Sequence, residues 1–146
     1  MKLTQLSVFL ENKPGQLKRA CDLLAQAKLN ILTLSLADTK EFGILRLLLN
    51  DWAQAKQVLG EGGFVVNTTE VLALEVADRP GGLAEILALV DKAGLNIEYM
   101  YAFSPGRRNQ DKAIMIFRFD NPDKAIEVLK AADINVVGSV ELYSPQ

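Results

Sequence analysis

The sequence contains no histidine and only one cysteine, Cys21. Without histidine the chain cannot build a Ser-His-Asp or Cys-His catalytic centre, or a zinc site with imidazole ligands. A single cysteine excludes an internal disulfide and a CxxC site, and this usage is typical of a reducing cytoplasm. Most of the common catalytic chemistry is therefore excluded at the outset.

A long apolar run and an excess of one charge are also missing. No segment approaches the roughly 18 apolar residues of a membrane helix. The first eleven residues alternate like a strand and reach a charge too early for a signal peptide. The 16 basic and 18 acidic side chains give a net charge of −2, which offers no attraction to nucleic acid or anionic lipid. We expect a cytoplasmic protein with neither a nucleic-acid nor a membrane partner.

What the chain does contain is an internal repeat of about 70 residues. Residues 11–31 align with residues 77–97 at an offset of 66, and later segments align at an offset of 70. The identical pairs are Pro14/Pro80, Gly15/Gly81, Leu17/Leu83, Leu23/Leu89, Ala27/Ala93, Leu29/Leu95, Asn30/Asn96 and Ile31/Ile97, followed by Ala55/Ala125, Val58/Val128 and Leu59/Leu129. The additional residues lie in 104–112. We therefore expect two domains, 1–68 and 69–146.

Each unit predicts the same order of elements. Alternating apolar residues indicate a half-buried strand at 6–10 and again at 72–76. The Pro-Gly pairs at 14–15 and 80–81 then open amphipathic helices, with proline at the first helical position. Two strands follow in each unit, at 31–36 and 44–49 and at 97–103 and 113–119. Second helices (51–59 and 121–131) and short last strands (64–66 and 134–137) complete the units.

The order βαββαβ predicts an α+β fold of the ferredoxin-like type, an antiparallel sheet with two helices on one face. A strand, then N-x-P-G-x-L or D-x-P-G-x-L, a helix, and L-N-I before the next strand resembles the ACT domain family of ligand-sensing regulatory modules. The resemblance occurs twice in register and covers nearly the whole chain, so the sequence looks like a tandem ACT protein. It implies two ACT-type units packed side by side, with a small effector, often an amino acid, bound at the interface between units.

The Pro-Gly turns supply a physical reason for such a site. Where strand turns to helix, unpaired N–H groups lie at the positive end of the helix dipole, an environment that suits a ligand carboxylate. Glycine has no Cβ to block a close approach. The resemblance implies that polar residues before the turn and at the next strand contact the effector. The predicted ligand-binding residues are Asn12, Pro14, Gly15, Leu17, Asn30, Ile31, Asp78, Pro80, Gly81, Leu83, Asn96 and Ile97.

Purely structural roles are open for the same residues. Asn12 or Asp78 could cap the turn through the amide of Gly15 or Gly81, and Asn30 and Asn96 could satisfy a helix-to-strand turn. If they do bind, the two sites differ, because the carboxylate of Asp78 repels a ligand carboxylate. The same carboxylate attracts an ammonium group, so the first turn grips the ligand carboxylate more tightly, and the second turn is weaker or binds the amino end of the ligand.

Aromatic residues alternate along two predicted strands, as Tyr99, Tyr101 and Phe103 and then Phe117 and Phe119. An RNA-recognition module stacks bases on such a sheet, but its signature run is missing here. We expect these side chains to pack against the other unit or a second chain. A bulge after Ile31 or Ile97 would invert which side chains face the sheet's two sides.

No catalytic residues, metal ligands or cofactor are predicted. We expect a non-catalytic sensor that binds a small amino acid or related metabolite and forms a homodimer, with a metabolic enzyme as a further candidate partner. A second hypothesis follows from L-E-N-K-P-G-Q-L, which also resembles the start of acetolactate synthase regulatory subunits. On that hypothesis the chain is a regulatory subunit or interaction module whose partner is a protein and not a metabolite.

Overall fold

The structure of the chain is a computed structural model that describes residues 1–103 and 111–143. Its residues divide into two compact units, Thr4–Thr69 and Glu70–Gln146, the second of which also holds Met1–Leu3. As a statement about domains, the extents 1–68 and 69–146 stay a prediction. Most of the longer loop expected at 104–112 lies outside the described residues.

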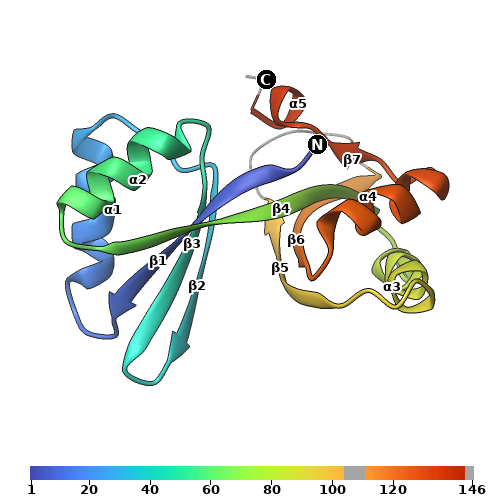
Figure 1. Cartoon of the computed structure of the whole chain (residues 1–146), viewed down its shortest axis with the longest axis horizontal. Helices are drawn as coiled ribbons and strands as arrows, with labels where there is room; N and C mark the ends of the chain where they lie inside the picture. The colour runs from blue at the N-terminus through green and yellow to red at the C-terminus, as the bar shows by residue number, and fades with distance from the viewer. Residues whose placement is uncertain (104–110, 144–146) are drawn as a thin grey trace. The chain divides into compact units, whose positions relative to one another are not determined.

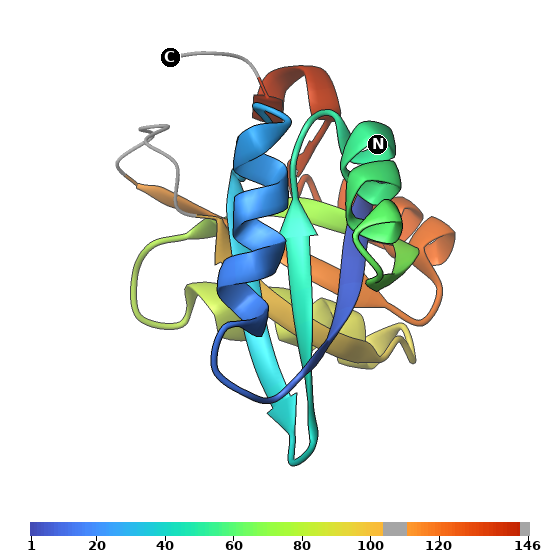
Figure 2. The ribbon, with the colours of Figure 1, turned by 90° about the vertical axis from the view of Figure 1, so that its left-hand side faces the viewer.

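The first unit contains β1 (Leu3–Glu11), α1 (Gln16–Gln26), β2 (Thr33–Thr39), β3 (Phe42–Leu48) and α2 (Trp52–Glu61), and it ends in the first residues of β4 (Val65–Ala77). Its strands lie in the order β2-β3-β1-β4, and β3 runs antiparallel to both β1 and β2. Figure 2 shows α1 and α2 together in front of these strands. The predicted βαββαβ order is confirmed in this unit.

The second unit repeats the arrangement with β4, α3 (Gly82–Lys92), β5 (Ile97–Phe103), β6 (Lys112–Phe119), α4 (Pro122–Ala131) and β7 (Val136–Val137), followed by α5 (Ser139–Tyr143). The strand order is β5-β6-β4-β7, the same order as in the first unit. The helices α3 and α4 lie together beside the strands of this unit (Figure 1). The α+β class with two such units is confirmed.

Period-two burial explains why the helices share one face. In β1 the side chains of Leu6, Val8 and Leu10 are almost fully buried and pack with Ala20 and Leu24 of α1. The second unit has a core of the same kind, formed by side chains from the helix-facing side of its sheet and from its two helices. Its buried residues are Leu72, Leu74, Val76, Ile86, Val90, Leu95, Phe117, Phe119, Ala125, Leu129 and Val136. Each unit therefore closes its own hydrophobic core between sheet and helices.

Two local predictions were wrong. The strands expected at 64–66 and 72–76 are parts of one 13-residue strand, β4, because residues 67–70 (Asn-Thr-Thr-Glu) contain no glycine or proline to interrupt it. The prolines of the Pro-Gly pairs are not the first helical residues. Gly15 and Gly81 are the N-caps, and the helices begin one residue later. By contrast, Pro122 does stand at the first position of α4, after an Asn121 side chain that accepts from the Lys124 amide at 3.1 Å.

The helices that the structure describes are short. None of them is long and apolar enough to cross a membrane.

Candidate functional site

The first corner, residues 12–15, joins β1 to α1 and is held by main-chain hydrogen bonds. The Asn12 amide donates to the Glu41 carbonyl in the β2–β3 hairpin at 2.8 Å, and the Lys13 amide donates to Glu11 at 2.9 Å. Gly15 follows with φ +90°, the left-handed region that glycine enters without a steric cost. The corner is therefore a tight turn fixed to the neighbouring hairpin.

The second corner, residues 78–81, repeats this geometry. The Asp78 amide donates to the Asp111 carbonyl at 2.8 Å and the Arg79 amide donates to Ala77 at 3.0 Å. Gly81 has φ +84°. The sequence repeat is therefore matched by a repeat of these two main-chain hydrogen bonds.

Both corners leave the start of their helix without a side-chain cap. The N-cap residues are glycines and make no side-chain cap hydrogen bond. The first helical amide donates to the main chain in each case, from Gln16 to Lys13 at 3.4 Å and from Gly82 to Arg79 at 2.9 Å. A Cβ built on Gly15 or Gly81 would meet no atom within 4 Å, so the space above each corner is open. An uncapped helix N-terminus facing open space is the electrostatic setting in which a carboxylate is stabilised.

Gly15→Ala is expected to lower the free energy of unfolding by about 1–2 kcal/mol, because the alanine must hold a left-handed conformation. The measurement is equilibrium denaturation. Gly60→Ala in α2 is the matched control, since a Cβ there also meets open space but the backbone is helical. Equal stabilities for the two variants would show that φ +90° is not required at residue 15.

The polar side chains of the two corners differ in their contacts. The Asn12 Nδ2 donates to the Lys40 carbonyl of the hairpin at 2.9 Å. This bond is not the alternative cap on Gly15, and it leaves the side-chain oxygen of Asn12 available as an acceptor. The residue equivalent to Lys40 in the second unit lies in 104–110, outside the described residues. Beside Asp78, the guanidinium of Arg79 pairs with Glu85 of α3 at 2.7 Å.

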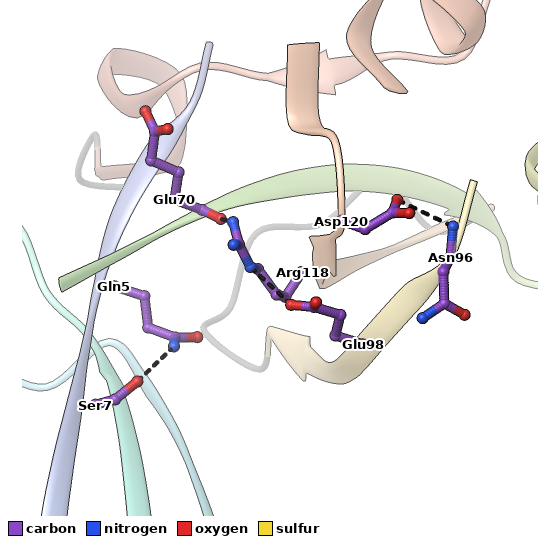
Figure 3. A network of polar contacts seen from close by, with 7 residues as sticks. All are labelled: Gln5, Ser7, Glu70, Asn96, Glu98, Arg118 and Asp120. Carbon is purple, nitrogen blue, oxygen red and sulfur yellow. Dashed lines mark hydrogen bonds and ion pairs between the residues drawn. The ribbon is translucent and has the colours of Figure 1, made fainter. Parts of the chain in front are cut away.

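The two other predicted polar contacts lie far from the corner of their own unit. Asn30 precedes β2 and Asn96 precedes β5, and both are exposed. The Asn96 amide donates to the Asp120 carboxylate at 3.0 Å, while the Asp120 amide donates back to the Asn96 carbonyl at 3.1 Å. Figure 3 shows the Asn96 side-chain amide pointing away from this pair. The backbone of Asn96 is therefore held while its side chain stays available.

Within one unit, Asn12 and Asn30 lie at opposite ends of α1. Figure 2 shows α1 running from the loop after β1 at one end of the sheet to the start of β2 at the other. A helix of 11 residues is roughly 16 Å long. A small molecule that touches Asn12 therefore cannot touch Asn30 of the same unit.

The predicted apolar contacts divide into two groups. Ile31 packs against the core of the first unit, and Leu83 and Ile97 pack against the core of the second. Leu17 is 37% exposed and lies two residues after Gly15, in the first turn of α1. Of the four side chains, only that of Leu17 is exposed, and ligand contact by any of them stays a prediction.

The aromatic residues face opposite sides of the second sheet. Phe117 and Phe119 are fully buried in the helix-side core. The pairing of β5 with β6 shifts register between Ile97 and Tyr99. This bulge turns Tyr99 and Tyr101 to the helix-free side, where Tyr99 lies across from Arg118. The five aromatics therefore form no single stacking surface.

Three features of the candidate site residues were not predicted from the sequence. The hairpin carbonyls of Lys40 and Glu41 that hold the first corner have no recognisable motif. Asp120 also belongs to no recognisable motif, although its carboxylate accepts the hydrogen bond from the Asn96 amide. Gly82 is a close-packing position, since a Cβ there would lie 1.9 Å from the Ala77 carbonyl oxygen. The Gly-Gly pair at 81–82 is the one sequence feature that could have indicated this close packing.

The described residues contain no candidate metal site. Among residues 1–103 and 111–143, no three His, Cys, Asp or Glu side chains gather closely enough to hold a metal ion.

Comparison with known proteins assigns the architecture. The family described as an ACT domain pair matches residues 1–144. The chain belongs to the ACT domain pair family. No curated protein sequence matches it. Protein BT0572 from Bacteroides thetaiotaomicron is 37% identical, with a TM-score of 0.90, and the match covers 99% of this chain and 98% of that one.

More distant ACT structures share the fold. The regulatory subunit of aspartate kinase from Thermus thermophilus has a TM-score of 0.63 at 12% identity, covering 89% of this ACT pair and 90% of that chain. The corresponding subunit from Thermus flavus has a TM-score of 0.59 at 16% identity, covering 89% and 92%. The predicted membership of the ACT family is confirmed, and these relatives bear the name of regulatory subunits.

Proposed function

We propose that this ACT pair is a non-catalytic, cytoplasmic regulatory protein that binds a small amino acid or a related metabolite at its corners. The observation that carries the proposal is the uncapped helix N-terminus over open space, formed twice by the same hydrogen bonds. A ligand carboxylate would accept from the first-turn amides that follow Gln16 and Gly82, and the side-chain oxygen of Asn12 would accept from the ligand ammonium group.

The ligand site draws on two ACT units. One unit holds its Asn12-type and Asn30-type residues roughly 16 Å apart, the length of an 11-residue helix, whereas an amino acid spans much less. An effector that contacts both types must take them from different units. The predicted position of the effector between units is therefore retained in the proposal, and binding would act by favouring one arrangement of units over another.

The two corners should bind unequally. A carboxylate at residue 78 repels a ligand carboxylate, whereas the amide of Asn12 does not. The Arg79–Glu85 pair places a further carboxylate in the first turn of α3, where it competes for the positive end of the helix. The first corner is the tighter of the two.

A thermal-shift screen with individual amino acids tests the function. At about 100 times its dissociation constant, a ligand that binds only the folded chain adds about 2.7 kcal/mol of stability. Asn12→Ala, which removes the oxygen that would accept from the ligand ammonium group, is expected to weaken binding by about tenfold. Asp78→Ala, at the weaker corner, should weaken binding less. Binding is measured by calorimetry, and the melting temperature of each ligand-free variant reports any loss of the bond to Lys40.

Two outcomes would contradict the proposal. Unchanged affinity in Asn12→Ala would remove the first corner from the site, and equal losses from Asn12→Ala and Asp78→Ala would reject the difference between the corners. A flat response to every amino acid, together with a stable complex between the chain and a metabolic enzyme, would favour the second hypothesis of a subunit that acts without its own ligand.

A further inference from the structure

The two units differ in how they hold the asparagine that ends the segment between the first helix and the second strand. In the second unit the Asn96 amide donates to the Asp120 carboxylate at 3.0 Å, and the Asp120 amide donates back to the Asn96 carbonyl at 3.1 Å. Both main-chain polar groups of Asn96 are thereby paired. The strand β5 begins at the next residue, Ile97. Asn96 is therefore fixed directly against the start of that strand.

A second side-chain contact fixes the same segment two residues further on. The Arg118 Nε donates to the Glu98 carboxylate at 3.1 Å, and the Arg118 Nη1 donates to the Glu70 carbonyl of β4 at 3.0 Å. Figure 3 shows the contacts made by Asp120 and by Arg118. Arg118 lies near the end of β6, and Asp120 directly follows that strand. The end of β6 thus restrains the chain at residue 96 and again at residue 98.

The first unit lacks both contacts. The residues that match Asn96, Glu98, Arg118 and Asp120 at the repeat offsets are Asn30, Leu32, Leu48 and Asn50. Leucine side chains form no ion pair, and in the described part of the chain no hydrogen bond joins Asn30 to Asn50. The strand β2 begins only at Thr33, three residues after Asn30. The asparagine is therefore fixed in one unit and not in the other.

We propose that Asp120 is a positioning residue for ligand binding, which acts by fixing Asn96 before the ligand arrives. The inference rests on the proposed function, because Asn96 is a predicted ligand contact. The Asn96 side-chain amide points away from Asp120 (Figure 3), so it can offer both a donor and an acceptor to an amino acid. A contact that is already ordered loses less conformational entropy on binding. Asn96 is thus the stronger of the two asparagine contacts, and Asn30 is the weaker.

Amide hydrogen exchange measured by NMR tests the positioning without any ligand. Asn96 and Asn30 are both preceded by leucine and followed by isoleucine, so their intrinsic exchange rates are matched. In the wild type the Asn96 amide should exchange at least about fivefold more slowly than the Asn30 amide. Asp120→Ala should remove this protection. Asp120→Asn should retain it, because the side-chain oxygen still accepts. Equal exchange of the two wild-type amides would overturn the proposal.

Calorimetry tests the role in binding, with the common amino acids titrated one at a time. For the amino acid that binds most tightly, Asp120→Ala should weaken affinity by about 3–10-fold, and Asp120→Asn should stay within about twofold of the wild type. In an Asn96→Ala background, Asp120→Ala should have little further effect, because no side chain is left to position. Asn50→Ala is the matched control in the first unit and should leave the affinity unchanged. Thermal unfolding shows that each variant is folded at the titration temperature.

The outcomes separate this inference from the proposed function. Wild-type affinity in Asp120→Ala would overturn the positioning role while the proposed function stands. An equal loss with and without the Asn96 side chain would overturn it too, because a purely structural role does not depend on that side chain. A wild type that binds none of the amino acids would contradict the proposed function, and the role of Asp120 in binding with it.

Discussion

Gly82→Ala is expected to lower the free energy of unfolding by more than about 3 kcal/mol, or to prevent the second unit from folding. A Cβ at residue 82 would lie 1.9 Å from the carbonyl oxygen and 2.9 Å from the carbonyl carbon of Ala77. Both atoms belong to the backbone of β4, so no side-chain rotation relieves the overlap. The start of α3 would have to move away from the strand that precedes it.

The first repeat supplies the control for this experiment. Gln16 occupies the equivalent position at the start of α1 and already carries a Cβ there. Gln16→Ala should therefore change stability by less than about 0.5 kcal/mol. Denaturant unfolding followed by far-UV circular dichroism compares the two variants. A Gly82→Ala protein as stable as Gln16→Ala would show that α3 can shift without loss, and that the close approach is not a constraint.

Phe117→Ala is expected to cost about 3–5 kcal/mol of unfolding free energy. The ring is fully buried between the sheet and helices of the second unit. It also stacks on Phe119, with ring centroids 5.7 Å apart. The substitution removes this stacking and leaves a cavity among residues that are themselves well packed. Thermal and denaturant unfolding measure the loss.

Phe42→Ala is the comparison for that result, because the Phe42 ring is 49% exposed. Its loss should be about 1 kcal/mol or less. Similar losses for the two variants would contradict the burial of Phe117. The same pair separates a core role from base stacking, since a ring that stacks on RNA must be exposed on the open sheet face.

The sequence was sufficient to predict the repeat, the order of elements and the family. These predictions follow from the periodicity of apolar residues and from the Pro-Gly pairs that mark turns, and neither signal depends on contacts between distant parts of the chain. The exact ends of the helices also depend on backbone conformation. Pro14 looked like a first helical residue, yet the chain needs Gly15 in a left-handed turn before α1 can start.

The facing of β5 could not be predicted for a different reason. Alternation along Tyr99 and Tyr101 is the same whether or not a bulge follows Ile97, and the register with β6 decides which side they face. The grouping of the predicted site residues could not be deduced from the sequence for a similar reason. The spacing of 18 residues between Asn12 and Asn30 recurs in the second repeat, but spacing along a chain does not reveal that α1 separates the two side chains.

The bond from each corner to its hairpin also bears on the length of that hairpin. The offset between repeats rises from 66 to 70, so the second repeat has four additional residues, and all of them precede Asp111. The bonds of residues 12 and 78 to carbonyls 41 and 111 are nevertheless both 2.8 Å long. The bond that holds each corner is therefore the same in the two repeats although the segments between β2 and β3 and between β5 and β6 differ in length. The corner geometry does not depend on the length of that connection.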